Sequence, residues 1–295
     1  MPAGASDRHD ELFQHFGRGG LRLFDRASLI GTHVPAVTQA LLEETGVPSA
    51  VPPYFTATAD DATVRLDATA ARTSEPSPPE LMKSWLRLGS DGLAHLCVRP
   101  DGAVQGVVLG AAAEDMFVNT DVSTFAASLM VLDRALPLIA SASSFPEAVE
   151  AFRDLAPQLR QIDASAFAER ESWWPRVLDD IRHTLNIPFS AAFEYVDATG
   201  AKQVETAATG PGSFHPEEII WRRLAQGGVD PRQVIRVYCE LEPCTMPGHY
   251  CAVWMRTTFP EAKFTHSFDY GDTAESREEG IKQLITHAAG EARSR

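Results

Sequence analysis

The sequence predicts two domains of different class, an α+β domain over residues 1–183 followed by an α/β three-layer domain over residues 184–295. Short strands followed by helices are typical of an α+β domain, and residues 84–183 show that order. After Asn186, strand and helix patterns alternate, which favours an α/β domain. The chain has 295 residues, 44% of them hydrophobic and 22% charged, which suits a globular protein of two domains.

The first part of the chain carries clear turn and helix signals. A helix is predicted at Val34–Thr45, because Gly46 and Pro48 follow it as stop signals. The Pro-rich stretch Thr73–Pro79 predicts a surface loop. Strands separated by Gly- and Asp-containing turns are expected at Ser84–Leu88, Ala94–Val98, Val104–Leu109 and Met116–Asn119. Helices are expected at Thr124–Ala135, Pro146–Leu159 and Glu171–Leu185.

The second part predicts the order β-β-α-β-α-β-α. Asp197–Gly200 is a turn sequence between the strands Ala191–Val196 and Lys202–Ala208, so these strands are expected to form a hairpin. Pro216 suits the first position of a helix, and the acidic residues after it suit the positive end of the helix dipole. The later elements are expected at residues 216–226 (helix), 234–240 (strand), about 249–257 (helix), 264–268 (strand) and 273–289 (helix).

Four residues of the second part have the chemistry of a zinc site with one open position. His215 offers a neutral nitrogen ligand, and Cys244 and Cys251 offer thiolates, which leaves one tetrahedral position for water. Zinc lowers the pKa of a bound water from 15.7 to about 7. Glu217, two residues after the histidine, is free to carry protons as general acid and base. The pattern therefore predicts Zn²⁺ ligands at His215, Cys244 and Cys251 and a catalytic Glu217.

These residues resemble the cytidine-deaminase-like superfamily, and more narrowly the bacterial polymorphic-toxin nucleic acid/nucleotide deaminases. The resembling segments are Ser213–Glu218, which contains H-x-E, and Val237–Cys251, which contains Pro243-Cys244. The resemblance implies a zinc-dependent hydrolytic deaminase acting on a nucleobase in a nucleotide, nucleoside or nucleic acid. His249, near the expected mouth of the site, and Tyr250, which can stack on a base, are the candidate substrate-binding residues.

The first part of the chain resembles the fourth subgroup of the SUKH immunity-protein family over roughly residues 10–183. The resembling stretches are Trp85–Gly92, Cys97–Val104, Val118–Thr120 and Ser172–Trp174. The resemblance implies an α+β binding domain, often encoded beside bacterial toxins, without catalytic residues. We therefore expect residues 1–183 to bind a protein partner.

Two features of the second part differ from the deaminase pattern. Six residues separate Cys244 from Cys251, where the superfamily usually has two, and no fifth core strand is apparent after residues 264–268. A turn at Pro247-Gly248 is expected to fold the insertion out and return Cys251 to the metal. Two alternatives follow: a structural zinc with His249 as fourth ligand, and a non-catalytic immunity protein that binds a toxin and carries a vestigial deaminase domain.

Charge and cysteine content restrict the partners and the compartment. The net charge is −14, whereas nonspecific nucleic-acid binders usually present a basic face, so we expect a nucleotide or single strand instead of duplex DNA. Three of the four cysteines lie within Cys239–Cys251, and the first residues do not resemble a secretion signal, which favours metal binding and a cytoplasmic protein. Cys239 itself is expected to be a buried strand residue. No apolar run approaches the ~20 residues that span a bilayer, so no membrane association is expected.

Overall fold

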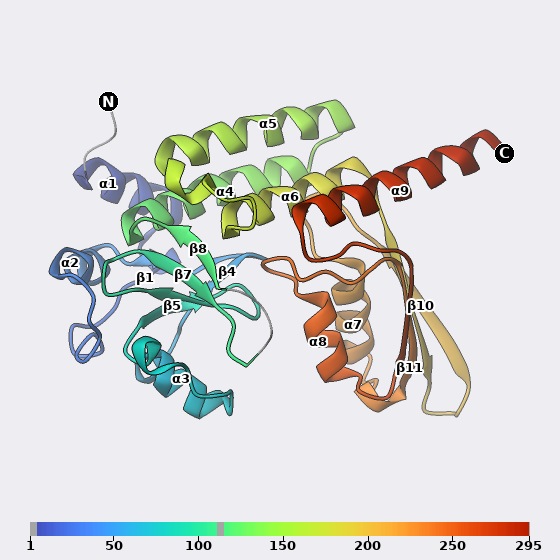
Figure 1. Ribbon diagram of the computed structural model, residues 1–295, viewed down its shortest axis with the longest axis horizontal. Helices are drawn as coiled ribbons and strands as arrows, with labels where there is room; N and C mark the ends of the chain where they lie inside the picture. Colours follow the sequence, from blue (N-terminus) through green and yellow to red (C-terminus); the bar gives the residue numbers. More distant parts are fainter. Residues whose placement is uncertain (1–4, 111–114, 295) are drawn as a thin grey trace. The chain divides into compact units, whose positions relative to one another are not determined.

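The computed structural model describes residues 5–110 and 115–294 (Figure 1). The chain divides into two compact units, with Met1–Leu138 and Glu150–Val177 in unit 1 and Ile139–Val149 and Leu178–Arg295 in unit 2. The predicted boundary between residues 183 and 184 falls inside one helix, α6 (Trp173–Asn186). The predicted fold class is confirmed, since an α+β part is followed by an α/β part.

Unit 1 is built on a six-stranded sheet in which each strand pairs antiparallel with the next one along the chain. Its strands are β3 (Ala50–Val51), β4 (Phe55–Ala57), β5 (Leu86–Ser90), β6 (His95–Val98), β7 (Val104–Val107) and β8 (Met116–Asn119). A separate pair joins β1 (Leu21–Arg22) to β2 (Val47–Pro48). The four predicted strands correspond to β5–β8. The strands β1–β4 were not predicted, because two or three residues carry no readable alternation.

The helices of the first part are α1 (Ala5–Phe16), α2 (Ala36–Glu44), α3 (Leu66–Thr73), α4 (Val122–Ala140) and α5 (Phe145–Ile162). Helix α4 packs on the sheet of unit 1, where the ring of Phe125 meets that of Phe55 of β4 edge to face, with centroids 5.3 Å apart. Helices α2, α4, α5 and α6 confirm the four predicted helices, with ends shifted by a few residues. Helices α1 and α3 were not predicted.

Helix α4 corrects one expectation about membranes. Its 19 residues are long and apolar enough, by length and composition alone, to cross a bilayer, so the statement that no apolar run approaches that length was wrong. The apolar window is 67% buried within the protein. The core helix of a globular protein has the same character, and α4 is therefore only weak evidence for a membrane span.

Polar groups tie α6 to the sheet within unit 1. The indole of Trp174 donates to Asn119 Oδ1 at 2.8 Å, and Asn119 in turn donates to Asp163 Oδ2 at 3.0 Å. Asp163 also accepts the backbone N–H of Thr120 at 2.7 Å. Trp173 and Trp174 are fully buried, with their rings edge to face at 4.8 Å. The tryptophan pair is therefore part of the core.

Unit 2 contains a four-stranded mixed sheet in the order β10-β9-β11-β12. The pairs β10/β9 and β9/β11 are antiparallel and β11/β12 is parallel. The elements are β9 (Ser190–Val196), β10 (Lys202–Ala208), α7 (Pro216–Gln226), β11 (Val234–Leu241), α8 (Cys251–Thr258), β12 (Lys263–Phe268) and α9 (Ala274–Ser294). The predicted order of strands and helices is confirmed, and the sheet of the described residues ends at β12 without a fifth strand.

Buried and exposed side chains alternate along β11, and the buried ones belong to the core of unit 2. Val237, Cys239 and Leu241 are buried in one apolar cluster, whereas Tyr238 between them is 37% exposed. Ile220 of α7, Met255 of α8 and Ile281 of α9 join the same cluster. After β11 the chain reaches Cys244, whose sulfur lies beside His215 at the start of α7, as does that of Cys251 at the start of α8.

We predict that Asp163→Ala lowers the free energy of unfolding by about 2–4 kcal/mol, because Asn119 and the Thr120 N–H would lose their buried acceptor. Urea unfolding followed by tryptophan fluorescence measures the change. Asp154→Ala on the exposed face of α5 is the control, expected to shift stability by less than about 0.5 kcal/mol. Equal effects of the two substitutions would contradict the role given to Asp163.

Candidate metal and catalytic site

His215 is the residue directly before α7, and a contact with the first turn of that helix fixes its backbone. It is the residue before Pro216, with extended backbone at φ −67° and ψ 156°, and its N–H donates to Glu218 Oε2 at 2.9 Å. This contact satisfies one donor at the helix N-terminus and places the imidazole inside the protein. The His215 side chain is 5% exposed.

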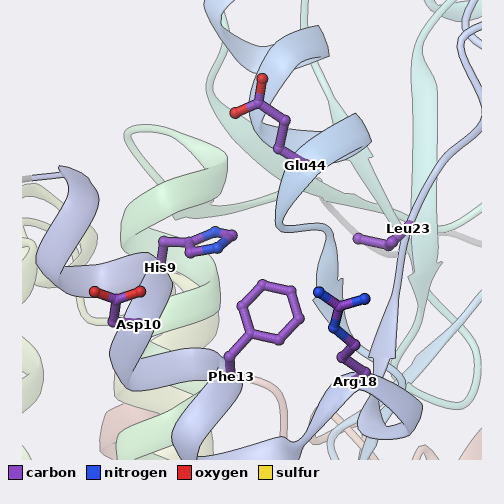
Figure 2. A pocket seen from close by; sticks show the side chains of 6 residues that line it. All are labelled: His9, Asp10, Phe13, Arg18, Leu23 and Glu44. Atoms are coloured by element: carbon purple, nitrogen blue, oxygen red, sulfur yellow. The ribbon is translucent and has the colours of Figure 1, made fainter.

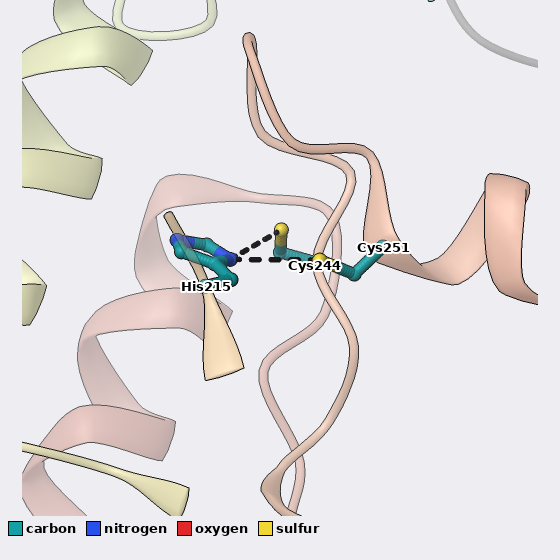
Figure 3. A group of neighbouring side chains, drawn as sticks. All are labelled: His215, Cys244 and Cys251. Carbon is teal, nitrogen blue, oxygen red and sulfur yellow. Dashed lines mark hydrogen bonds between the residues drawn. The ribbon is translucent and has the colours of Figure 1, made fainter. Parts of the chain in front are cut away.

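The two predicted cysteine ligands converge on one nitrogen of this imidazole. Cys244 lies just after β11, and Cys251 is the first residue of α8. Their sulfurs are 3.4 Å and 3.6 Å from His215 Nδ1 (Figure 3). A tetrahedral ion with Zn–N of about 2.05 Å and Zn–S of about 2.3 Å needs N···S separations of about 3.6 Å. The three ligand atoms lie within 4.8 Å of one another and could hold such an ion.

The six residues between the cysteines contain the predicted turn at Pro247-Gly248 and return Cys251 to the cluster, but Met246 and His249 among them are buried and not folded out. The N–H of Ala252 donates to the carbonyl of Cys244 at 2.9 Å and closes the loop at its base. Gly248 (φ 84°) and Tyr250 (φ 46°) supply the left-handed backbone that reverses the chain. Met246 is fully buried, as are most of its neighbours in the loop. The insertion therefore contributes side chains to the interior beside the cluster.

Glu217 lies one position inside α7 and is 2% exposed. Burial raises the pKa of its carboxyl, an effect that His215 and hydrogen bonds from its own backbone N–H and the Cys239 thiol oppose. Its Oε2 has no hydrogen-bond partner within the part of the chain that the structure describes. Cys239 is buried in β11 as expected, and its thiol donates to the Glu217 carboxylate. Glu217 thus presents one oxygen that no group of residues 5–110 and 115–294 hydrogen-bonds.

His249 and Tyr250 lie beside the cluster and not at an open mouth. The His249 side chain is fully buried and its ring stacks on that of His215, with centroids 3.7 Å apart and planes 3° from parallel. Its Nδ1 lies 2.6 Å from Glu218 Oε2, and its Nε2 lies 3.1 Å from Asp180 Oδ2. Tyr250 is 3% exposed. The predicted substrate-binding role of both residues stays a prediction.

Asp180 and Glu218 are site residues that the sequence did not reveal. Asp180 lies on α6 and accepts from His215 Nε2 at 3.1 Å, so one carboxylate meets both stacked imidazoles. Glu218 carries the hydrogen bonds from the His215 N–H and from His249. An acidic residue on an amphipathic helix ordinarily faces solvent, and Asp180 carries no signal that distinguishes it from its neighbour Asp179.

The electrostatics of the cluster stabilise an imidazolium beside a thiolate. Burial opposes the charge on Cys244, but hydrogen bonds from Cys251 and His215 hold the pKa of its thiol well below the ordinary value. Burial likewise opposes protonation of His215, yet Cys244 and Asp180 raise its pKa well above the ordinary value. Burial and the neighbouring Cys244 raise the pKa of Cys251. Binding of a metal by these groups would release the protons that they carry.

A small cavity opens onto this cluster. It encloses about 10 Å³ of free volume, about what the centre of one water molecule requires. Its lining residues within unit 2 are Asp180, His183, Thr184, Phe189, His215, Glu217, Leu241, Glu242, Cys244 and Tyr270. His183 meets the Tyr270 hydroxyl at 2.7 Å on one side of the cavity. The cavity therefore holds a water-sized reactant next to Glu217, and a nucleobase would need it to widen.

Unit 1 has a wider surface pocket between α1, the 3-10 turn after it, and α2. Its lining residues are His9, Asp10, Phe13, Arg18, Leu23 and Glu44 (Figure 2). Charges of both signs surround two apolar side chains there, and no group of potential metal ligands falls among these residues.

Comparison with known proteins matches both parts of the chain. The family model of the SUKH-4 immunity proteins matches residues 8–180, which is more than half of the chain. A family model described as Xanthomonas-like deaminase matches residues 188–287. Both family resemblances found in the sequence are thereby confirmed. No curated protein and no solved structure is significantly similar.

We predict that the contribution of His183 to the stability of unit 2 decreases as the pH falls from 7 to 5. Burial, reinforced by Arg182, lowers the pKa of His183 to about 4. The unfolded chain, with a histidine pKa of about 6.5, binds a proton first, so acidification favours unfolding by about 2 kcal/mol at pH 5. Urea unfolding at pH 7 and pH 5 measures this loss. His183→Gln should lose about 2 kcal/mol less over the same interval, and an unchanged loss would refute the assignment.

Proposed function

Because the chain belongs to the SUKH-4 immunity protein family and carries a deaminase domain after the matched segment, we propose that it joins a protein-binding domain to a zinc-dependent hydrolytic deaminase. The substrate we propose is a nucleobase in a nucleotide, nucleoside or single-stranded nucleic acid. The observation that carries the proposal is the convergence of His215, Cys244 and Cys251 beside a buried Glu217, one of whose carboxylate oxygens has no hydrogen-bond partner among the described residues.

The donor set fits zinc better than a harder cation. One imidazole and two thiolates suit Zn²⁺, whereas Mg²⁺ and Ca²⁺ take oxygen ligands. The 3.4 Å and 3.6 Å nitrogen–sulfur separations agree with the tetrahedral value of about 3.6 Å. Three protein ligands leave the fourth position for water, which distinguishes a catalytic from a structural site. When bound, the ion supplies an acidified water, with a pKa of about 7 in place of 15.7.

His249 does not complete a four-ligand structural site in this arrangement. Its Nε2 lies 3.1 Å from Asp180 Oδ2 and its Nδ1 lies 2.6 Å from Glu218, and among the described residues His249 groups with Asp180 and His215 and not with the two cysteines. This observation favours the catalytic site over the structural alternative.

Glu217 moves the protons in the proposed reaction. Water adds to the amidine carbon of the base, the C–N bond breaks, ammonia leaves, and the water oxygen stays as the new carbonyl. One proton of the water must reach the ring nitrogen and another the leaving amine. Burial, which raises the pKa of Glu217, suits a group that both accepts and returns a proton near neutral pH. The hydrogen bond from Cys239 orients the carboxylate for this transfer.

The larger, amino-terminal part supplies the protein contact. We propose residues 1–183 for partner binding and residues 184–295 for catalysis, in the cytoplasm of a bacterium and in a toxin, immunity or defence context. The free state of all four cysteines agrees with that compartment. A non-catalytic immunity protein with a vestigial deaminase domain is the competing hypothesis, and metal content and turnover separate the two.

We predict one zinc ion per chain in protein purified without chelator, measured by inductively coupled plasma mass spectrometry. Cys244→Ala and Cys251→Ala each remove a thiolate and should reduce bound zinc by at least tenfold. Cys97→Ala is the matched control, since burial raises the pKa of this thiol of β6 to about 12 and keeps it protonated. A wild-type protein free of zinc would refute the metal assignment.

We predict that Glu217→Gln abolishes ammonia release while leaving zinc bound, because the amide cannot carry protons. The expected loss in turnover is about 10²–10⁴-fold. Screening nucleosides, nucleotides, single-stranded DNA and single-stranded RNA identifies the substrate for the measurement. The exposed Glu261→Gln serves as control and should keep wild-type turnover. Full activity of Glu217→Gln would rule out its proposed role.

A further inference from the structure

We propose that Asp180 of α6 is a positioning residue of the metal centre, which fixes the imidazole of His215 in the orientation that presents Nδ1 to the ion. The inference rests on the proposed zinc function and adds to it a residue from outside the segment that the deaminase family model matches. Asp180 is the last residue of the segment that the SUKH-4 family model matches.

The carboxylate of Asp180 meets two imidazoles with its two oxygens. Oδ1 lies 3.1 Å from His215 Nε2, and Oδ2 lies 3.1 Å from His249 Nε2. The side chain of Asp180 is only 3% exposed. Both rings contact this one planar carboxylate, and they stack with their planes 3° from parallel and their centroids 3.7 Å apart. Asp180 therefore contacts the edge of the His215 ring, and the ring of His249 covers one of its faces.

A chain of polar contacts links this carboxylate to the backbone of the site. His249 continues from Asp180 to Glu218 Oε2 at 2.6 Å, and the same oxygen accepts the His215 N–H at 2.9 Å. The chain joins α6, the start of α7 and the loop between the cysteines. Helix α6 carries Asp180, the start of α7 follows the proposed ligand His215, and the loop joins the proposed ligands Cys244 and Cys251.

The physical effect of Asp180 is on the second nitrogen of the ligand. An imidazole that donates Nε2–H to a carboxylate keeps Nδ1 as the metal-binding atom and becomes a stronger base. The nitrogen that faces the sulfurs is Nδ1, as this arrangement requires. Removal of such an outer carboxylate typically lowers metal affinity 10–100-fold.

A buried carboxylate also needs partners of its own. An isolated charge in the protein interior is strongly disfavoured unless it is paired and hydrogen-bonded. The two histidines are the partners of Asp180, and they lower the pKa of its carboxyl far enough, against the opposing effect of burial, to keep it ionised. Asp180, His215 and His249 therefore hold one another in place.

The test measures the zinc affinity of full-length Asp180→Asn by competition with a chromophoric chelator at pH 7.5. The amide nearly preserves the shape of the side chain but loses the charge and one acceptor. We expect zinc affinity 10–100-fold below that of the wild type. Asp179→Asn is the matched control on the same helix; that side chain pairs with Arg182 at 2.8 Å, and its loss should change zinc affinity less than twofold.

The melting temperature of the zinc-free proteins separates positioning from packing. A purely structural role would lower the melting temperature of Asp180→Asn and leave its zinc affinity equal to that of the wild type, and this outcome would overturn the inference. If Asp180→Asn fails to fold, Asp180→Glu keeps the charge but displaces it, and at least several-fold weaker zinc binding is expected; wild-type affinity would overturn the inference. A wild-type chain that binds no zinc refutes the proposed function itself.

Discussion

The burial of one imidazole, with both ring nitrogens in need of partners, organises the whole site in unit 2. His215 faces two sulfurs through Nδ1 and a carboxylate through Nε2. A buried polar group without a partner is costly, so the segments that supply these partners must all be in place at once. Asp180 comes from α6, Cys251 from the start of α8, and Cys244 from the segment that follows β11. The mixed sheet provides the support, because β11 ends shortly before Cys244, whose sulfur lies 3.4 Å from His215 Nδ1 at the start of α7.

The residues that widen the spacing between Cys244 and Cys251 include buried side chains that contact the site. A loop that folded outward would return Cys251 to the cluster and contribute nothing else. Here the Ala252–Cys244 backbone hydrogen bond closes the loop, and His249 turns inward to stack on the ligand imidazole. The extra residues thus provide the second imidazole that Asp180 and Glu218 bind. Insertion length alone does not decide whether a site is intact; the direction in which the loop folds does.

The sequence was informative wherever the signal is local. Strands β5–β8, the β9–β10 hairpin and the start of α7 follow from turn residues and helix caps within a few positions. The motif residues were found because their spacing has chemical meaning. Helix α1 was missed because its residues are polar overall. Asp180 was missed because its partner His215 is 35 residues away, and an aspartate on a helix looks the same whether it faces water or a histidine. Burial of His249 depends on a loop direction that no local pattern encodes.

Helix α6 also limits how the two functions can be separated. Its first turn supplies Trp173 and Trp174, which donate to Asp91 and Asn119 within unit 1. Its later turns supply Asp180 and His183 to unit 2. A cut at residue 186 would remove Asp180 from the proposed metal site, and a cut before residue 173 would take the tryptophan pair from the core of unit 1. A loss of activity in either fragment would therefore have two explanations, damage to α6 and the absence of the other domain. Point substitutions in the full chain are the sounder way to ask whether the immunity-family part restrains or directs the deaminase.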